Sequence, residues 1–150
     1  MAAQRAEVLE RVSFLQDLPR WIIVAMAEAV YEREYQAGEY VFQQSDPALG
    51  MYVVRTGRLV CDQQQQGTDV LRRIGQVGPG DAVGARALLG DFRRPTSAQA
   101  TEPTVMLAFF RPALQALMAR QPRAAAEIMA AIARHIAAQV PDALQSPDLV

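Results

Sequence analysis

The N-terminal part of the chain carries apolar residues at the spacing of amphipathic helices. Four of them recur at intervals of one, three and three positions: Val8, Leu9, Val12 and Leu15. A second helix can open at Pro19, because the missing amide of proline costs no hydrogen bond in a first turn. That helix runs through "RWIIVAMAEAVYE". We expect Trp21, which stands beside Ile22 and Ile23, to lie in the core.

The middle of the chain has short strand-like segments separated by turn residues. The segments are "YEREYQ", "YVFQQ", "MYVVR", "RLVCDQ", "DVLRRIGQV" and "TVMLAFF". All nine glycines lie between Gly38 and Gly90, and glycine punctuates hairpins but weakens helices. The run Gln63 to Gln66, closed by Gly67, is expected to form a solvated hairpin tip. This spacing predicts a β-sandwich or β-barrel.

The C-terminal part is again helical in pattern. "PALQALMAR" follows Arg111, and a longer helix can start at Pro122. One face of this longer helix carries an apolar stripe: Ala125, Ile128, Met129, Ile132, Ile136 and Val140. His135 lies beside the stripe, where we expect a partly exposed polar edge. Residues 141–150 hold two prolines and little periodicity, which predicts a flexible tail.

Composition narrows the classes of function. A chain of 150 residues, 51% of them hydrophobic, can form one domain with its own core. The net charge of −1 argues against a dedicated nucleic-acid-binding protein, so any anion site must be local. Every basic residue is an arginine, a planar donor suited to phosphate. With one cysteine and one histidine, Cys61 and His135, we expect no intrachain disulfide, no thiolate or imidazole metal cluster and no nucleophile–base pair.

The absence of a long apolar run in the sequence predicts a cytoplasmic protein with no membrane association.

The residues best suited to binding a ligand are concentrated in "VGARALLGDFRRPTSA", residues 83–98. Gly84 allows close backbone approach, and a helical turn at 87–89 would present free amides at its N-terminal end. Arg94 can return over the same point, and Ser97 offers a hydroxyl. From these residues alone, an anion site and a plain surface turn are equally open.

Several motifs in order resemble the cyclic nucleotide-binding domain of catabolite-activator-type regulators, kinase regulatory subunits and gated channels. The resemblance covers about residues 8–138 and rests on "AGEYVFQQSDPALGMYVVRTGRLV", "GPGDAVGARALLGDFRRPTSAQA" and "FRPALQALMARQP". It implies an α+β fold over residues 1–140. An antiparallel β-barrel of the jelly-roll, cupin-like type is expected at about 31–110. Helices flank it at the N-terminus and at about 111–140.

The second motif resembles the family's phosphate-binding cassette. This resemblance implies that Arg94 pairs with a cyclic phosphate. It further implies that phosphate and ribose contacts come from the rest of the cassette: Gly84, Ala85, Ala87, Leu88 and Ser97. The expected ligand is cAMP or another cyclic nucleotide, with no cofactor or metal.

Two positions depart from the family pattern. Ala85 stands where the family has a glutamate that accepts a hydrogen bond from the ribose 2′-hydroxyl, a loss of about 1.5–3 kcal/mol. Pro95 follows the arginine and has no amide to donate. Arg86 and Arg93 add charge nearby. They could compensate, accept a more anionic ligand such as a cyclic dinucleotide, or be solvated.

The resulting prediction is a non-catalytic sensor module that binds a cyclic nucleotide with weakened or altered selectivity. The alternative is a degenerate member that no longer binds nucleotide and serves as an interaction or dimerisation module. In either case the helix at 122–140 is expected to form a homodimer or contact a partner protein, as the family's dimerising helix does. Direct DNA binding is not expected, because only about ten residues follow Val140.

Overall fold

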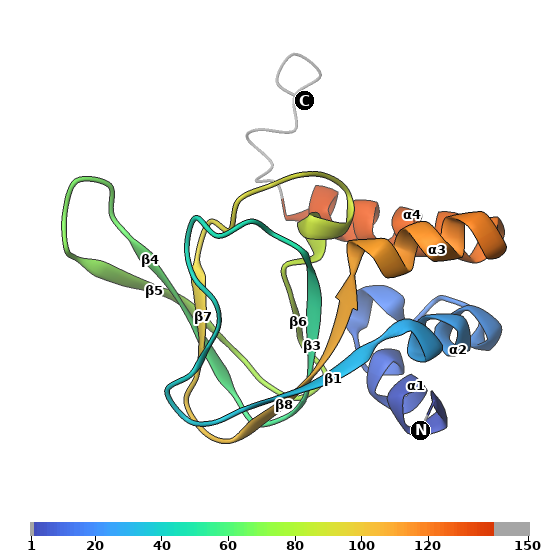
Figure 1. Cartoon of the computed structure of the whole chain (residues 1–150), viewed down its shortest axis with the longest axis horizontal. Coiled ribbons are helices and arrows are strands. Elements are labelled where there is room, and N and C mark those ends of the chain that lie inside the picture. The colour runs from blue at the N-terminus through green and yellow to red at the C-terminus, as the bar shows by residue number, and fades with distance from the viewer. Residues whose placement is uncertain (1, 140–150) are drawn as a thin grey trace, which may run out of the picture.

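The computed structural model describes residues 2–139 and separates them into a β-roll and a group of helices (Figure 1). The helical elements are α1 (Ala2–Glu10), η1 (Ser13–Leu15), α2 (Arg20–Ala29), η2 (Ala85–Leu88), α3 (Arg111–Arg120) and α4 (Pro122–Ala138). The strands are β1 (Tyr31–Tyr35), β2 (Tyr40–Phe42), β3 (Gly50–Thr56), β4 (Leu59–Gln64), β5 (Leu71–Val77), β6 (Ala82–Val83), β7 (Ser97–Ala100) and β8 (Thr104–Phe110).

The strands form two four-stranded sheets with the orders β1-β8-β3-β6 and β2-β7-β4-β5. Every described strand pair is antiparallel. The two sheets face each other, and α1 to α4 cover the outer face of the first sheet (Figure 1). The predicted α+β class, with an antiparallel roll between N-terminal and C-terminal helices, is confirmed.

Strand β3 explains why "MYVV" is an unbroken apolar run. Side chains of a strand alternate between its two faces. Met51 and Val53 pack into the helical core, whereas Tyr52 and Val54 point into the roll between the sheets. A strand that is covered on both faces exposes neither face to water, so it carries apolar residues at successive positions. The neighbouring β8 is buried on both faces in the same way.

The helices form their own core against the first sheet. Ile22, Ile23 and Met26 of α2 are fully buried in it. The prediction that Trp21 lies in the same core is wrong, because its side chain is 45% exposed. Its neighbours Ile22 and Ile23 lie on the buried face of α2. The centroid of the Trp21 ring instead lies 6.0 Å from the guanidinium carbon of Arg123 on α4.

The apolar stripe of α4 is used within the chain. Ala125, Ile128 and Ile132 are buried in the helical core, and Met129 and Ile136 pack at its edge. These side chains are therefore covered by the domain's own helices. Val140 and the predicted tail at 141–150 lie outside the described residues. No helix within residues 2–139 is long and apolar enough to cross a membrane.

The glutamine run is only partly a hairpin tip. Gln63 and Gln64 lie within β4, whose register pairs them with Arg72 and Leu71 of β5. The turn itself takes residues 65–70, where Gly67 has a φ of 77°. The β4–β5 hairpin projects from the roll, and its tip is exposed (Figure 1).

Candidate functional site

The cassette opens at Gly84, between β6 and η2. Gly84 has a φ of 78°, a left-handed conformation that glycine adopts without strain. A Cβ at this position would collide with Nη1 of Arg94. The backbone conformation and the space taken by Arg94 therefore both favour glycine here.

The turn that follows Gly84 begins earlier than the sequence suggested. It is a 3₁₀ helix over Ala85–Leu88 rather than a turn at 87–89. Its first backbone hydrogen bond runs from the Ala87 amide to the Gly84 carbonyl, at 3.1 Å. The amides of Ala85 and Arg86 precede that bond and have no partner within the helix. Ala85, Ala87 and Leu88 are buried, so this turn is fixed by packing.

Arg94 is the central side chain of the site. It is 4% exposed, and its Nη2 donates to the Gly50 carbonyl oxygen at 2.6 Å. Its guanidinium carbon lies 4.1 Å from the ring centroid of Phe42 and 5.8 Å from that of Tyr52. None of the ion pairs in the described residues includes Arg94. A buried arginine without a carboxylate partner is uncommon in a purely structural role.

The pKa and the unpaired Nε atom of Arg94 also indicate a role in binding an anion. Burial lowers the pKa of its guanidinium from the ordinary value, and Tyr52 and Asp46 only partly oppose this shift. The Nε atom of Arg94 is buried and makes no hydrogen bond in the described structure. The domain therefore holds a desolvated cation with an unused donor. An anion bound beside it would supply both the missing charge and the missing acceptor.

A second loop holds the arginine segment in place from the other side. The Ser45 amide donates to the Arg94 carbonyl and the Arg94 amide donates to the Asp46 carbonyl, both at 2.8 Å. The Ala48 amide likewise donates to the Phe92 carbonyl at 2.8 Å. Residues 45–48 thus form a ladder of backbone hydrogen bonds along the cassette, and the Asp46 carboxylate accepts a further hydrogen bond from the Gln43 amide.

Arg111, at the start of α3, fastens the cassette to the helices. Its Nε donates to the Ala87 carbonyl at 2.9 Å, and its Nη2 donates to the carbonyls of Ala48 and Gly90 at 2.9 and 2.5 Å. One side chain therefore joins η2, the loop after η2 and the loop at 45–48. The sequence placed Arg111 only as the residue before a helix, because nothing in its neighbourhood reveals these long-range acceptors.

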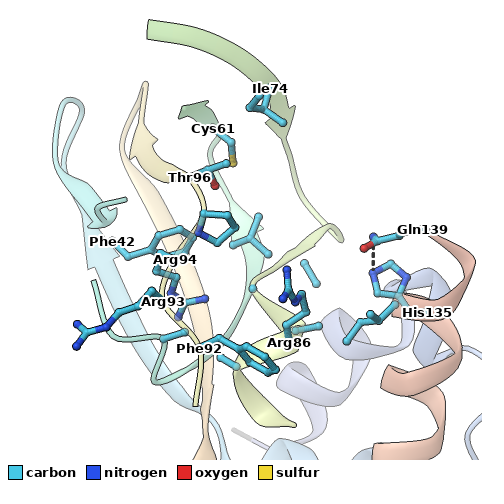
Figure 2. Close-up of a pocket in the computed structure, with 18 residues that line it drawn as sticks. Phe42, Cys61, Ile74, Arg86, Phe92, Arg93, Arg94, Thr96, His135 and Gln139 are labelled. Atoms are coloured by element: carbon cyan, nitrogen blue, oxygen red, sulfur yellow. Dashed lines mark hydrogen bonds between the residues drawn. The ribbon is translucent and has the colours of Figure 1, made fainter. Parts of the chain in front are cut away.

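A cavity of about 250 Å³ lies over the cassette (Figure 2). Predicted residues that line it are Gly84, Ala85, Ala87, Arg86, Arg93 and Arg94. Residues that the sequence analysis did not assign to the site also line it: Phe42, Ala48, Cys61, Ile74, Ala82, Val83, Phe92, Pro95, Thr96, His135, Ile136 and Gln139. The lining contains three arginines and no aspartate or glutamate. Although the whole chain is slightly acidic, this cavity is basic.

Two predicted site residues lie outside this lining. Leu88 is buried in the helical core beneath η2. Ser97 lies at the start of β7, where its Oγ accepts a hydrogen bond from the Gln44 amide at 2.8 Å. Its neighbour Thr96 lies in the cavity wall instead. The sequence places Thr96 and Ser97 side by side and does not reveal which one faces the cavity.

The end of α4 forms the wall opposite the cassette (Figure 2). His135 stacks on Phe14 with ring centroids 4.0 Å apart, and its Nε2 lies 3.1 Å from Nε2 of Gln139. Burial lowers the pKa of His135 from its ordinary value. The prediction of a partly exposed His135 is confirmed.

Cys61 of β4 also lines the cavity. Burial raises the pKa of the Cys61 thiol, with a further contribution from Asp62, and this keeps the thiol protonated.

Comparison with known sequences identifies the fold's family. The cyclic nucleotide-binding domain family matches residues 32–121. The Cyclic AMP receptor protein of Thermus thermophilus is 32% identical over 114 residues, which are 75% of this chain and 52% of that relative. The type II regulatory subunit of the cAMP-dependent protein kinase of Drosophila melanogaster is 33% identical over 103 residues, 69% of this chain and 27% of the relative. The chain therefore spans about half, or less, of these relatives' length.

Solved structures agree on the fold. The N-terminal domain of a transcriptional regulator from Streptomyces coelicolor superposes with a TM-score of 0.78 at 22% identity, covering 87% of this chain and 93% of that one. The regulatory domain of Toxoplasma gondii PKA with cAMP gives 0.72 at 19% identity, covering 78% and 45%. With a family match over residues 32–121 and two relatives above 30% identity over two thirds of its length, the chain belongs to the cyclic nucleotide-binding domain family.

Proposed function

We propose that this domain is a non-catalytic regulatory module that binds a cyclic nucleotide by its phosphate in the cavity over the cassette. The observation that carries the proposal is Arg94. It is a buried guanidinium with no carboxylate partner and an unused Nε donor, and it lies at the floor of a basic cavity. Gly84, Ala85 and Arg86 also line this cavity, and free amides at the start of a helical turn are a common feature of phosphate sites.

The family relation supports the ligand class. The name of the Thermus thermophilus relative includes cyclic AMP, and the Toxoplasma gondii domain was solved with cAMP. The burial of Arg94 and its unpaired Nε atom agree with a phosphate ligand.

The cavity argues for altered selectivity. A ribose 2′-hydroxyl is best held by a charged acceptor, and Ala85 supplies none. The rest of the cavity lining contributes no carboxylate either. Pro95 has no amide to donate. We therefore expect this chain to bind cyclic nucleotides with little dependence on the 2′-hydroxyl, and with lower affinity than a domain that keeps the glutamate.

Signalling from the cavity would pass through two contacts. Arg111 joins the cassette backbone to α3, and the end of α4 lines the cavity directly. A ligand that changes the packing of η2 or α4 would therefore change how the C-terminal helices lie. The alternative role as a dimerisation module through the α4 stripe finds less support, because Ile128 and Ile132 are already buried in the domain.

Isothermal titration calorimetry tests this proposal. The purified chain is titrated with cAMP and cGMP up to about 1 mM ligand. We expect binding heat for the wild type, a loss of roughly 30-fold or more in affinity for Arg94→Met, and no change for Arg72→Met. Arg72 is an exposed arginine of β5 outside the cavity lining, so it controls for the loss of one charge. Absence of heat with every cyclic nucleotide would refute the proposal and favour the interaction-module alternative.

A further inference from the structure

The three arginines of the cavity are not equivalent. Arg94 is buried at its floor, while Arg86 and Arg93 are exposed. Arg93 extends away from the cavity centre (Figure 2), and its Nη1 donates to the Ser45 carbonyl at 3.4 Å. Arg86 instead rises from η2 into the space between Arg94 and His135 (Figure 2). Arg86 is therefore a second cation aimed at whatever occupies the cavity.

The Arg86 side chain contacts an aromatic ring beside the cavity. Its guanidinium carbon lies 4.9 Å from the ring centroid of Phe92, a cation–π contact across the loop that follows η2. None of the ion pairs recorded among residues 2–139 includes Arg86. A guanidinium has only donors, so the group it can bind must be an acceptor, and an anionic acceptor binds most strongly.

The cavity lining carries more positive charge than one phosphodiester can neutralise. A cyclic mononucleotide carries a single negative charge, and Arg94 alone matches it. Bound at Arg94, such a ligand would leave Arg86 facing it without an anionic partner, since no carboxylate lines the cavity. A ligand with a second negative charge would neutralise both guanidinium groups and remove their mutual repulsion.

We infer that the cavity selects a dianionic cyclic nucleotide, whose phosphate is held by Arg94 and whose second anionic group is held by Arg86. This inference rests on the proposed function and specifies its ligand. Two kinds of ligand share the required chemistry. One is a cyclic mononucleotide with an anionic group on its ribose, and the other is a cyclic dinucleotide with two phosphodiesters.

The test compares three probes on the full chain by calorimetry or by competition with a fluorescent cyclic nucleotide. The probes are cAMP, its 2′-O-succinyl derivative and cyclic di-AMP. We expect at least one dianion to bind about tenfold or more tightly than cAMP at low salt, and this ratio to shrink at high salt. Preference for the succinyl derivative alone would indicate an anionic ribose substituent, and preference for cyclic di-AMP would indicate a dinucleotide.

Arg86→Gln separates the charge of Arg86 from its bulk. We expect this variant to reduce the dianion-to-cAMP affinity ratio to about one, and the matched Arg72→Gln control to leave the ratio unchanged. If cAMP binds through Arg94 but neither dianion is preferred, or if Arg86→Gln leaves the ratio unchanged, this inference is overturned and the proposed function stands. If no probe binds, both fail.

Discussion

Replacing Arg94 by methionine separates a binding role from a structural one. Methionine keeps an unbranched side chain and removes the charge. Three energies change together. The hydrogen bond to the Gly50 carbonyl is lost, at about 1.5–3 kcal/mol for a charged donor. The contact over Phe42 is lost, at about 2 kcal/mol for a desolvated pair. The substitution also removes the cost of burying a cation without a charged partner, which is several kcal/mol and favours the folded state of the variant.

These energies nearly cancel, so we expect the free energy of unfolding of Arg94→Met to stay within about 1.5 kcal/mol of the wild type. Cyclic nucleotide affinity should fall by roughly 30-fold or more. Arg111→Met is the matched comparison. Arg111 makes three hydrogen bonds to backbone carbonyls. Its loss should lower the free energy of unfolding by about 2–4 kcal/mol.

The assay is urea denaturation followed by far-ultraviolet circular dichroism, for the wild type and both variants without ligand. A binding titration of each variant runs in parallel. If Arg94→Met is destabilised as strongly as Arg111→Met, Arg94 stabilises the fold and the reasoning from its missing partner is wrong. The reasoning also fails if Arg94→Met keeps the affinity of the wild type.

Three further predictions concern substitutions of single residues. Gly84→Ala should lower cyclic nucleotide affinity about tenfold or more, because its Cβ would displace Nη1 of Arg94. Gly38→Ala has a similar left-handed φ with open space around it, so it should share the backbone strain and keep the affinity, and equal losses in a titration of both would contradict this. Ile132→Ala should lower the free energy of unfolding by about 2–5 kcal/mol in urea, since its side chain is fully buried, and a change below about 1 kcal/mol would instead place this residue on a free surface. Because burial lowers the pKa of His135 in the fold, its contribution to stability is present above about pH 6.5 and is lost as pH falls through the folded pKa. The Tm of the wild type should therefore drop more between about pH 7.5 and 5.5 than that of His135→Gln, and parallel curves would count against this linkage.

Much of the fold could be predicted from the sequence because its local signals agree. Glycines confined to the middle of the chain mark the roll, and the uniform apolar runs in β3 and β8 are those of strands buried on both faces. Gly84 and Arg94 could be predicted as a pair, because they belong to one continuous motif. The contact between Arg94 and Gly84 in the structure gives that pairing a physical reason.

The rest of the site could not be predicted, because it depends on contacts between distant segments. Phe42, His135 and Gln139 come from β2 and the end of α4, and no local pattern joins them to the cassette. The three acceptors of Arg111 are backbone carbonyls, which carry no sequence signal. The exposure of Trp21 could not be predicted, because apolar neighbours in the sequence do not reveal which side of a helix faces the solvent.

The affinity ratio between cAMP and 2′-deoxy-cAMP tests the central claim most directly. Arg94 should hold the phosphate of both ligands, and Ala85 offers the 2′-hydroxyl no acceptor. Calorimetry should therefore give binding of both, with dissociation constants within about threefold of each other. Loss of about tenfold or more in affinity for the deoxy ligand, or no binding of either, would contradict the account.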